Sequence, residues 1–413
     1  MILNLYTFLH RSVGFILTWL EELGGLKYML GAFTKNKSLT QTDQEGAAEN
    51  SLGQNIQASN QYQDSLNVII APWYTDNPYQ QKLADQLTQK GHKVTGVSCS
   101  TSSLLKTVKN NQADVLHLHW LHHFFLEEES GFRAVLKLCL FIVQLFILRF
   151  SKVNIVWTIH NLKNHQNKYL LLDNIASFLV AHIVHKLIVH SETAKTEVAQ
   201  KFCLTNQQRI HVLPHANYIG SYPNTTTRQD ARRSLNLPES GLVLLFLGTI
   251  HPYKGVADLL QAFKKLNSTN TYLVIAGKVK DQGLADELTT AAKNDAHVRY
   301  LPGFIPDEQL QIYMNVANTI VFPYREFLTS GAVILAMSFG KACIAPRRGH
   351  IGEVLDDVGA FLYDPDLPDG LLQALHASMQ PPERLDKMGQ HNYQVASHWT
   401  WDMITEKTLA VYQ

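Results

Sequence analysis

Two helix-capping hydroxyls and two small residues stand together at Thr329, Ser330, Gly331 and Ala332, behind the apolar run 319–322. Capping by Thr329 or Ser330 would start a helix whose first N–H groups lie under no bulky side chain. Those N–H groups and the helix dipole favour an anion, so the stretch predicts a diphosphate site. An ordinary buried strand–helix–strand unit is the alternative interpretation.

Residues that could neutralise a diphosphate follow a second apolar run. Residues 242–247 (LVLLFL) end in Gly248, and the chain continues as GTIHPYKG. Gly248 permits a ligand close to the backbone, and Lys254 can reach a phosphate as a point charge. A lysine in a surface loop is common, so Lys254 alone does not establish the site.

In the first half, polar side chains follow apolar runs. Trp73, Tyr74 and Asp76 follow one run, His117 and His119 end another, and His160 follows a third. Such positions face the edge of a parallel sheet where ligands bind, so these histidines could hydrogen-bond a substrate or stabilise charge. Satisfied histidines in packed loops are favoured for His117 and His119, and a functional role for His160. The spacing does not indicate a metal site.

Short apolar runs that alternate with helical or loop segments must position these residues. The strands expected in the first half are 67–71, 93–99, 114–119, 154–159 and 186–189, and those in the second are 242–247, 272–276, 298–301, 319–322 and 342–345. The alternation predicts α/β domains, each a doubly wound parallel sheet with helices on both faces. A polar stretch, 224–228, is the expected crossing between them.

Composition limits the function classes. The chain has 413 residues, 46% of them hydrophobic and 17% charged, which fits two globular domains. A net charge of +1 gives no general attraction to nucleic acid. The four cysteines have no paired or metal-type spacing, which favours a reducing compartment and a cytoplasmic location.

Two segments raise the question of a membrane. Residues 1–35 are apolar with helical periodicity but are interrupted by charges, so they could lie on a membrane or dock on the protein. Residues 36–66 are polar and predict a flexible linker. Residues 134–150 are the most apolar stretch and predict a helix in the core or pressed on a membrane face. A transmembrane helix there is disfavoured, because it would split a sheet whose strands lie on both sides.

The second half resembles the nucleotide-sugar glycosyltransferases of the GT-B fold, specifically glycosyl transferase family 4 ("group 1"). Six stretches carry the resemblance in order: LFLGTIHPYKGVADLLQAF (245–263), YLVIAGK (272–278), VRYLPGFIPDEQLQIYMNVANTIVFPY (298–324), LAMSFGKACIAP (335–346), GHIGEVLDDVGAFLYDP (349–365) and HWTWDMITEKTLAVY (398–412). The first half resembles the family less closely, through GHKV (91–94) and the T-x-H-N of 158–161.

The resemblance implies two Rossmann-like domains facing a central cleft. Residues 67–223 would bind the acceptor, residues 224–395 would bind the nucleotide diphosphate sugar, and a helix at 396–413 would return to the first domain. It implies no cofactor and no metal. Lys254 is similar to the family's diphosphate-contacting lysine, and His160 to its cleft histidine near the sugar.

Two departures from the family pattern affect the site. The family carries an arginine after Gly248, where this chain has Thr249; His251 or Arg325 could supply that charge. The family's two glutamates would fall at Phe327 and Leu335. Glu326 could replace the first through a one-residue shift, but the second is missing.

The sequence therefore predicts a hexosyltransferase that uses a nucleotide diphosphate sugar and a lipid-linked saccharide or polysaccharide acceptor. Peripheral membrane contact through residues 1–35 or 134–150 is an open alternative. An inverting mechanism would need a general base, for which Asp76 is the nearest candidate. A catalytically silent sugar-nucleotide-binding protein and a sugar-nucleotide epimerase are the alternatives. The sugar, the stereochemistry and the oligomeric state remain open.

Overall fold

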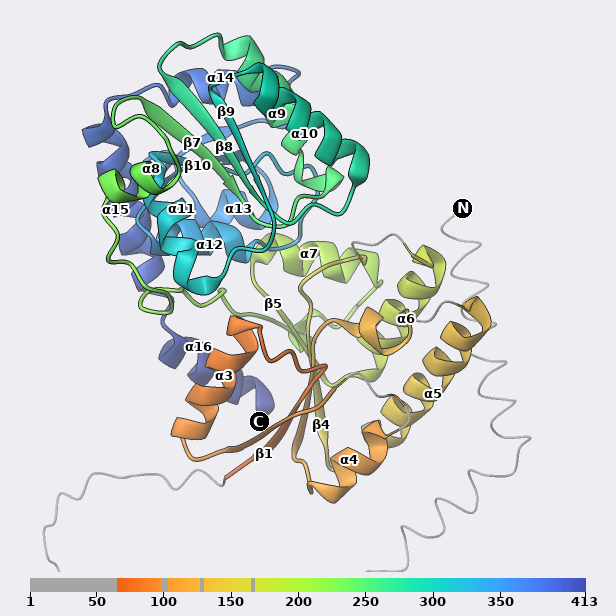
Figure 1. Ribbon diagram of the computed structural model, residues 1–413. Coiled ribbons are helices and arrows are strands. Elements are labelled where there is room, and N and C mark those ends of the chain that lie inside the picture. Colours follow the sequence, from red (N-terminus) through yellow and green to blue (C-terminus); the bar gives the residue numbers. More distant parts are fainter. Residues whose placement is uncertain (1–64, 99–100, 102, 127–129, 165–167) are drawn as a thin grey trace, which may run out of the picture. The chain divides into compact units, whose positions relative to one another are not determined.

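The computed structural model describes residues 65–98, 101, 103–126, 130–164 and 168–413. The predicted segment 1–35 and nearly all of the predicted linker 36–66 lie outside these residues. The described chain contains two six-stranded sheets, each made of parallel strands (Figure 1).

The first sheet has the order β2-β1-β3-β4-β5-β6. Its strands are β1 (Asn67–Ala71), β2 (Lys93–Gly96), β3 (Val115–Leu118), β4 (Asn154–Thr158), β5 (Lys186–Val189) and β6 (Ile210–Val212). The predicted strand 93–99 is shorter than expected and ends at Gly96, where a Cβ would lie 2.4 Å from the Trp73 ring. The sequence does not predict β6, because three residues are too few to show a period.

Helices cover both faces of this sheet, as the alternation predicts. They are α3 (Pro78–Gln89), α4 (Leu104–Asn110), α5 (Gly131–Arg149), α6 (Leu170–Ile183), α7 (Glu192–Lys201) and, from the far end of the chain, α16 (Trp401–Tyr412), with 3₁₀ turns η1 (Leu121–Phe124) and η2 (Gln207–Arg209). Ile69 and Leu116 pack in the cluster that contains α5 and α6. Their neighbours Ile70 and Val115 pack in the cluster that contains α3 and α16. Successive strand residues thus build opposite cores.

The second sheet has the order β12-β11-β10-β7-β8-β9. Its strands are β7 (Leu242–Leu247), β8 (Thr271–Gly277), β9 (Val298–Pro302), β10 (Thr319–Val321), β11 (Ala342–Pro346) and β12 (Ala360–Tyr363). Its helices are α8 (Arg228–Ser234), α9 (Val256–Leu266), α10 (Gln282–Asn294), α11 (Leu310–Val316), α12 (Gly331–Ser338), α13 (Gly349–Val354), α14 (Gly370–Ala377) and α15 (Pro382–Ser397), with 3₁₀ turns η3 (Pro252–Lys254) and η4 (Asp307–Gln309). We call the first sheet with α3–α7 and α16 the N-terminal half, and the second sheet with α8–α15 the C-terminal half.

The chain passes between the halves twice, once before α8 and once between α15 and α16 (Figure 1). Helix α16 packs on α3 and β4. The Tyr412 hydroxyl lies 2.8 Å from Nδ1 of His117, and Asn154 donates a 2.8 Å hydrogen bond to the Tyr412 carbonyl. The last helix therefore completes the core of the N-terminal half.

A carboxylate from the C-terminal half caps a helix of the N-terminal half. Glu353 on α13 accepts hydrogen bonds from the backbone N–H groups of Glu192 (3.0 Å) and Thr193 (2.6 Å) at the start of α7. These N–H groups have no partner inside their own helix, and the positive end of the helix dipole favours a negative charge there.

Helix α5 is the one described helix long and apolar enough to cross a membrane by length and composition. It is packed on the N-terminal half through Leu138, Phe141 and Leu145. Its opposite stripe is exposed, with Phe132 73% and Leu136 53% accessible. The apolar stretch predicted at 134–150 is thus a helix that covers the core on one side and faces outward on the other.

Candidate active site

Lys254 is the central cation of the site. It ends the 3₁₀ turn η3 behind β7, and its Nζ lies 5.4 Å from the centre of the Tyr324 ring. No carboxylate of the described residues forms an ion pair with it. Burial lowers the pKa of Lys254 to about 8, because an ammonium that has lost water is less stable when charged. An unpaired, partly desolvated ammonium is suited to bind an anion.

Glycines bring the backbone close around this lysine. Gly255 has φ +66°, and a Cβ there would lie 1.9 Å from the Pro323 carbonyl oxygen. Gly277 has φ +141°, and a Cβ there would lie 1.9 Å from the Gly248 carbonyl oxygen. Only glycine fits such positions. The loops after β7, β8 and β10 therefore meet at Lys254.

The helix start predicted at 329–332 is present. Ser330 is the N-cap of α12, and its hydroxyl accepts a 3.4 Å hydrogen bond from the N–H of Val333. Gly331 and Ala332 are half-exposed, and their N–H groups donate no hydrogen bond to another described residue. The buried Thr329 hydroxyl also has no partner among the described residues. Free donors thus remain at the end of the helix where an anion is favoured.

The residues expected to replace the missing arginine differ in charge. Burial, with Lys280 and Lys254 nearby, lowers the pKa of His251, which therefore favours its neutral form. Arg325 keeps its charge, but Nη2 and Nε lie 2.5 and 2.6 Å from the two carboxylate oxygens of Asp258 on α9. Thr249 is exposed and uncharged. Lys254 is thus the member of the predicted set whose charge is not matched by a carboxylate.

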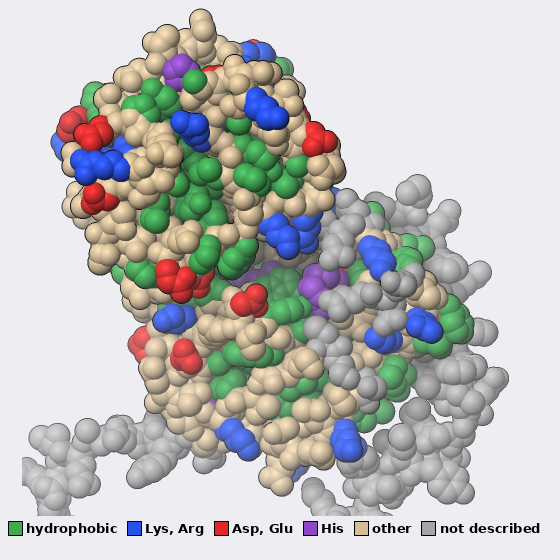
Figure 2. All heavy atoms as spheres, viewed as in Figure 1, with side chains coloured by type: hydrophobic (Ala, Val, Ile, Leu, Met, Phe, Trp, Pro, Cys, Tyr) green, Lys and Arg blue, Asp and Glu red, His purple; other side chains and the backbone are tan. Residues whose placement is uncertain are grey.

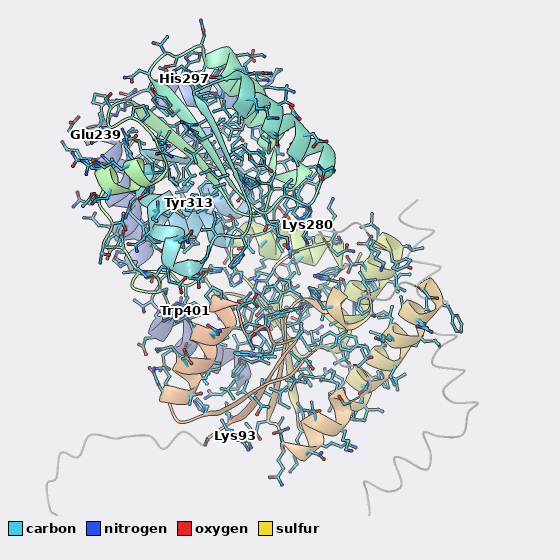
Figure 3. The ribbon with its side chains drawn as sticks, viewed as in Figure 1. Lys93, Glu239, Lys280, His297, Tyr313 and Trp401 are labelled. Carbon is cyan, nitrogen blue, oxygen red and sulfur yellow. The ribbon has the colours of Figure 1, made fainter. Side chains whose placement is uncertain are left out.

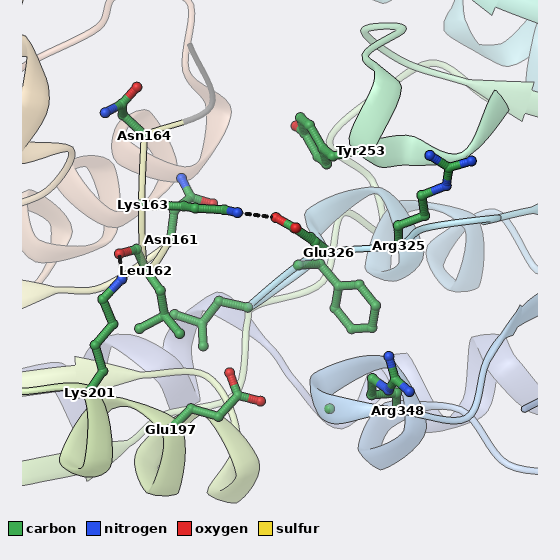
Figure 4. A pocket seen from close by; sticks show the side chains of 13 residues that line it. Asn161, Leu162, Lys163, Asn164, Glu197, Lys201, Tyr253, Arg325, Glu326 and Arg348 are labelled. Carbon is green, nitrogen blue, oxygen red and sulfur yellow. Dashed lines mark hydrogen bonds and ion pairs between the residues drawn. The ribbon is translucent and has the colours of Figure 1, made fainter. Parts of the chain in front are cut away.

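Glu326 joins the halves. Its Oε2 lies 2.5 Å from Nζ of Lys163, in the loop after β4 (Figure 4). Both side chains are about half exposed, so the pair contributes little to stability. Glu326 and Arg325 line a cavity of about 430 Å³ between that loop and the start of α13.

The ring of His160 packs against the ring of Trp120. The two rings are stacked with centroids 4.4 Å apart, and Nε2 of His160 lies 3.0 Å from Nδ1 of His119. His160 is 9% exposed, and burial and neighbouring histidines lower its pKa well below the ordinary value. A neutral imidazole at the end of β4 can hydrogen-bond a substrate, whereas a buried imidazolium would be unstable.

His117 and His119 are buried in the N-terminal half. His117 lies 2.7 Å from the Thr158 hydroxyl through Nε2, in addition to its contact with Tyr412. His117 thus lies within strand β3 and not in a loop, and both of its ring nitrogens contact side-chain hydroxyls. Nδ1 of His119 contacts Nε2 of His160, and Nε2 of His119 has no hydrogen-bond partner within the described residues.

Three further buried histidines extend this group: His190, His215 and His350. Nε2 of His215 would lie 3.3 Å from a Cβ at Gly331, directly beside the start of α12. Among the described atoms, Nε2 of His190 and both ring nitrogens of His350 have no hydrogen-bond partner. Sequence reasoning missed these histidines. His190 directly follows β5, the same signal that singled out His160, whereas His215 follows β6, which the sequence does not predict.

Asp76 is exposed in the loop before α3. It is close enough to Asp307 of the C-terminal half to raise the pKa of that carboxyl, together with burial and Glu308. It does not line the cavity that contains Lys254.

That cavity has a volume of about 420 Å³ and is lined by both halves. It contains Thr249, His251 and Lys254 of the predicted set, together with Asn161, which follows His160. Asn161 and Tyr253 also line the cavity that contains Glu326. In the described part of the chain, no three His, Cys, Asp or Glu side chains gather as metal ligands would.

Comparison with known proteins gives a family for the C-terminal half. Residues 227–395 match the family described as Glycosyl transferases group 1. The match covers all of the C-terminal sheet and the loops around Lys254 and α12.

Curated relatives are bacterial transferases. The chain is 26% identical over 276 residues to a GDP-mannose:glycolipid 4-beta-D-mannosyltransferase of Xanthomonas campestris pv. campestris, which covers 65% of this chain and 73% of that protein. It is 26% identical over 233 residues to a lipopolysaccharide 1,2-N-acetylglucosaminetransferase of Salmonella typhimurium, which covers 54% of this chain and 60% of that protein.

Solved structures share the fold. The crystal structure of Anabaena Alr3699/HepE in complex with UDP has a TM-score of 0.64 at 14% identity, over 84% of this chain and 98% of that chain. A sucrose-phosphate synthase from Thermosynechococcus elongatus has a TM-score of 0.65 at 16% identity, with the same coverage. The described chain therefore has the GT-B fold, with two Rossmann-like domains, as the sequence predicts.

Proposed function

Because residues 227–395 belong to the glycosyl transferases group 1 and the chain is a glycosyltransferase of the GT-B fold, we propose that it transfers a hexose from a nucleotide diphosphate sugar to a lipid-linked saccharide or polysaccharide. The observation that supports this most directly is Lys254, an ammonium that is partly desolvated and has no carboxylate partner among the described residues. Its place in the loop after β7 also agrees with the family resemblance, which implies a diphosphate-contacting lysine at this position.

We propose the following roles. Departure of the nucleotide diphosphate leaves negative charge on its phosphates and positive charge on the sugar. Lys254 and the free N–H groups of Gly331 and Ala332 stabilise the phosphate charge, and the neutral His160 binds the sugar. Closure of the halves, joined by Lys163 and Glu326, excludes water that would hydrolyse the donor.

The proposal requires no metal, because the cation at the diphosphate is Lys254. Transfer in the presence of excess EDTA is the outcome consistent with this. In this proposal, residues 67–223 bind the acceptor and residues 224–395 bind the donor. Asp76 as a general base remains a proposal for the inverting case alone.

The test is the Lys254→Met variant, which keeps the length of the side chain and removes its charge. Lys264→Met, an exposed lysine on α9 of the same half, is the matched control. Thermal shift with UDP, GDP and ADP identifies the nucleotide. Turnover is then measured with the matching sugar nucleotides and membrane extract, starting with GDP-mannose and UDP-N-acetylglucosamine because two relatives carry those sugars in their names.

We expect Lys254→Met to lower kcat/KM by about 10²-fold or more, the loss typical of removing one donor to a developing charge. The nucleotide-induced shift should also weaken above pH 8, where Lys254 loses its proton. Equal activity of the two variants would contradict the proposal. Tight nucleotide binding without turnover in the unaltered chain would instead favour the catalytically silent alternative.

We also propose that the protein works at the cytoplasmic face of a membrane, with the exposed stripe of α5 against the lipid. The stripe consists of Phe132, Val135, Leu136, Leu140 and Val143, and the start of α6 adds Leu170 and Leu171. An exposed apolar patch of this kind marks an interaction surface. It lies on the half that would bind a lipid-linked acceptor.

A further inference from the structure

The cavity that contains Lys254 has more positive charge than one diphosphate requires. Two other lysines, Lys278 and Lys280, line it from the loop after β8, and none of the described aspartates or glutamates lines it. Both lysines are exposed, and neither forms an ion pair with a described carboxylate. Lys254, by contrast, lies deeper, against Tyr324.

The backbone directs the two lysines toward the cavity. Ile250 and Val279 form a parallel bridge, and the N–H of Ile250 donates a 2.8 Å hydrogen bond to the carbonyl of Lys278. Ile250 is fully buried and Val279 packs on the same core. Because side chains alternate along an extended backbone, Lys278 and Lys280 point to the side opposite Val279, as Thr249 and His251 do relative to Ile250.

The facing wall, from the N-terminal half, is aromatic. Tyr74 contacts Trp120 edge-on, with ring centroids 5.6 Å apart, and His123 at 5.2 Å. In Figure 2, Lys and Arg side chains of the C-terminal half face histidine side chains across the hollowed part of this surface, and Figure 3 places Lys280 on that rim. A sugar ring fits the aromatic wall, and an anion fits the lysine wall.

We infer that Lys278 and Lys280 form a second anion subsite, separate from the donor diphosphate at Lys254, and that the acceptor is a saccharide carrying a phosphate or carboxylate group there. The inference depends on the proposed transfer function and specifies its acceptor. The acceptor sugar lies on Tyr74 and Trp120, and its anionic group lies against the two lysines. Within the part of the chain that the structure describes, neither lysine has a carboxylate partner and no carboxylate lines the cavity, so their charge is available to a ligand.

The experiment compares three soluble probes built on one disaccharide. The first is its neutral citronellyl glycoside, and the second is the same glycoside with a terminal glucuronate. The third is the disaccharide joined to citronellol through a diphosphate. Binding to the full chain is measured by tryptophan fluorescence, because Trp120 lies in the cavity wall. The variant is Lys278→Ala/Lys280→Ala. The control is Lys264→Ala/Lys293→Ala, which removes the same charge from exposed positions on α9 and α10.

We expect at least one charged probe to bind about tenfold or more tighter than the neutral glycoside in low salt. The charged probe that binds more tightly identifies the anionic group of the acceptor as a carboxylate or a phosphate. The Lys278/Lys280 variant should bind all three probes with the affinity of the neutral one, while its thermal shift with the matching nucleoside diphosphate is unchanged. The control should keep the preference.

Equal binding of charged and neutral probes would overturn the inference, as would a preference that survives in the Lys278/Lys280 variant. Loss of the nucleotide shift in that variant would place the lysines in the donor subsite and also overturn it. If the unaltered chain binds no nucleoside diphosphate, the proposed function itself fails, so the two failures are distinguishable.

Discussion

At the residue scale, the molecule contains several buried histidines in their neutral form. Burial lowers the pKa of His117, His215 and His350 to about 3, and that of His190 to about 4. Their ordinary pKa near 6.5 returns in the unfolded chain. The unfolded state therefore binds more protons than the folded state between pH 6.5 and 4, and folding stability falls as the pH falls through that window.

We expect each of these histidines to contribute about 1.4 kcal/mol per pH unit to that loss. His350→Leu should reduce the slope of unfolding free energy against pH by about one proton. At pH 7.5 the variant should be about as stable as the unaltered chain, because neither ring nitrogen of His350 has a described partner to lose. Urea unfolding from pH 7.5 to 4.5 measures this.

The control for that measurement is His376→Leu, an exposed histidine on α14. It should leave the slope unchanged. A slope that is the same in both variants would mean that His350 is protonated in the folded state.

At the element scale, one glycine determines where the cation of the site lies. The positive φ of Gly255 lets helix α9 begin against the Pro323 carbonyl, and Lys254 precedes it. The loop after β7 and the loop after β10 must therefore pack against each other. The donor site depends on it, because Lys254 reaches Tyr324 only when the two loops are in contact.

Gly255→Ala should destabilise the fold by about 2 kcal/mol or more, because the added Cβ would lie 1.9 Å from a backbone oxygen. It should also weaken nucleotide binding. Gly283→Ala, in the first turn of α10, meets only the Asp281 carboxylate at 3.5 Å and should be neutral or slightly stabilising. Thermal unfolding with and without nucleotide compares them, and equal midpoints would show that the loop shifts freely.

Much of this element level is predictable from the sequence. Apolar runs locate β5 and β7 at their observed bounds, and the helix start at Ser330 follows from capping chemistry alone. The contacts that complete the site are not predictable in this way. Glu353 caps α7 from 160 residues away along the chain, and local pattern contains no information about such a partner.

The histidines illustrate the same limit. The position of His160 after a strand is visible in the sequence, but its stacking on Trp120 and its contact with His119 depend on how β3 and β4 pair. Similarly, the pairing of Arg325 with Asp258 is set by the meeting of two loops. The sequence predicts that Arg325 is available to the donor, whereas the geometry commits it to a carboxylate.

At the scale of the whole molecule, the exposed apolar stripe of α5 lies on the half that would hold the acceptor. The opposite face of α5 packs in the hydrophobic core, which holds the helix and its exposed stripe in place. Such a surface could hold the mouth of the acceptor site close to lipid.

Phe132→Ser/Leu136→Ser should lower binding of the full chain to phosphatidylglycerol vesicles by about tenfold or more, since each side chain contributes on the order of 1.5 kcal/mol when buried in an apolar phase. Phe304→Ser/Val358→Ser removes equally exposed apolar side chains from the C-terminal half and is the control. Vesicle flotation is the measurement. Undiminished flotation of the α5 variant would assign the contact to another part of the chain.

The return of α16 to the N-terminal half has a practical consequence for dissecting this protein. A cut at the crossing before α8 would leave the first fragment without the helix whose Tyr412 hydroxyl meets His117. The second fragment would carry that helix with its apolar face in water. A polypeptide that joins residues 65–223 directly to 399–413 restores the native partner, so each domain can be produced separately only after the sequence order is rearranged.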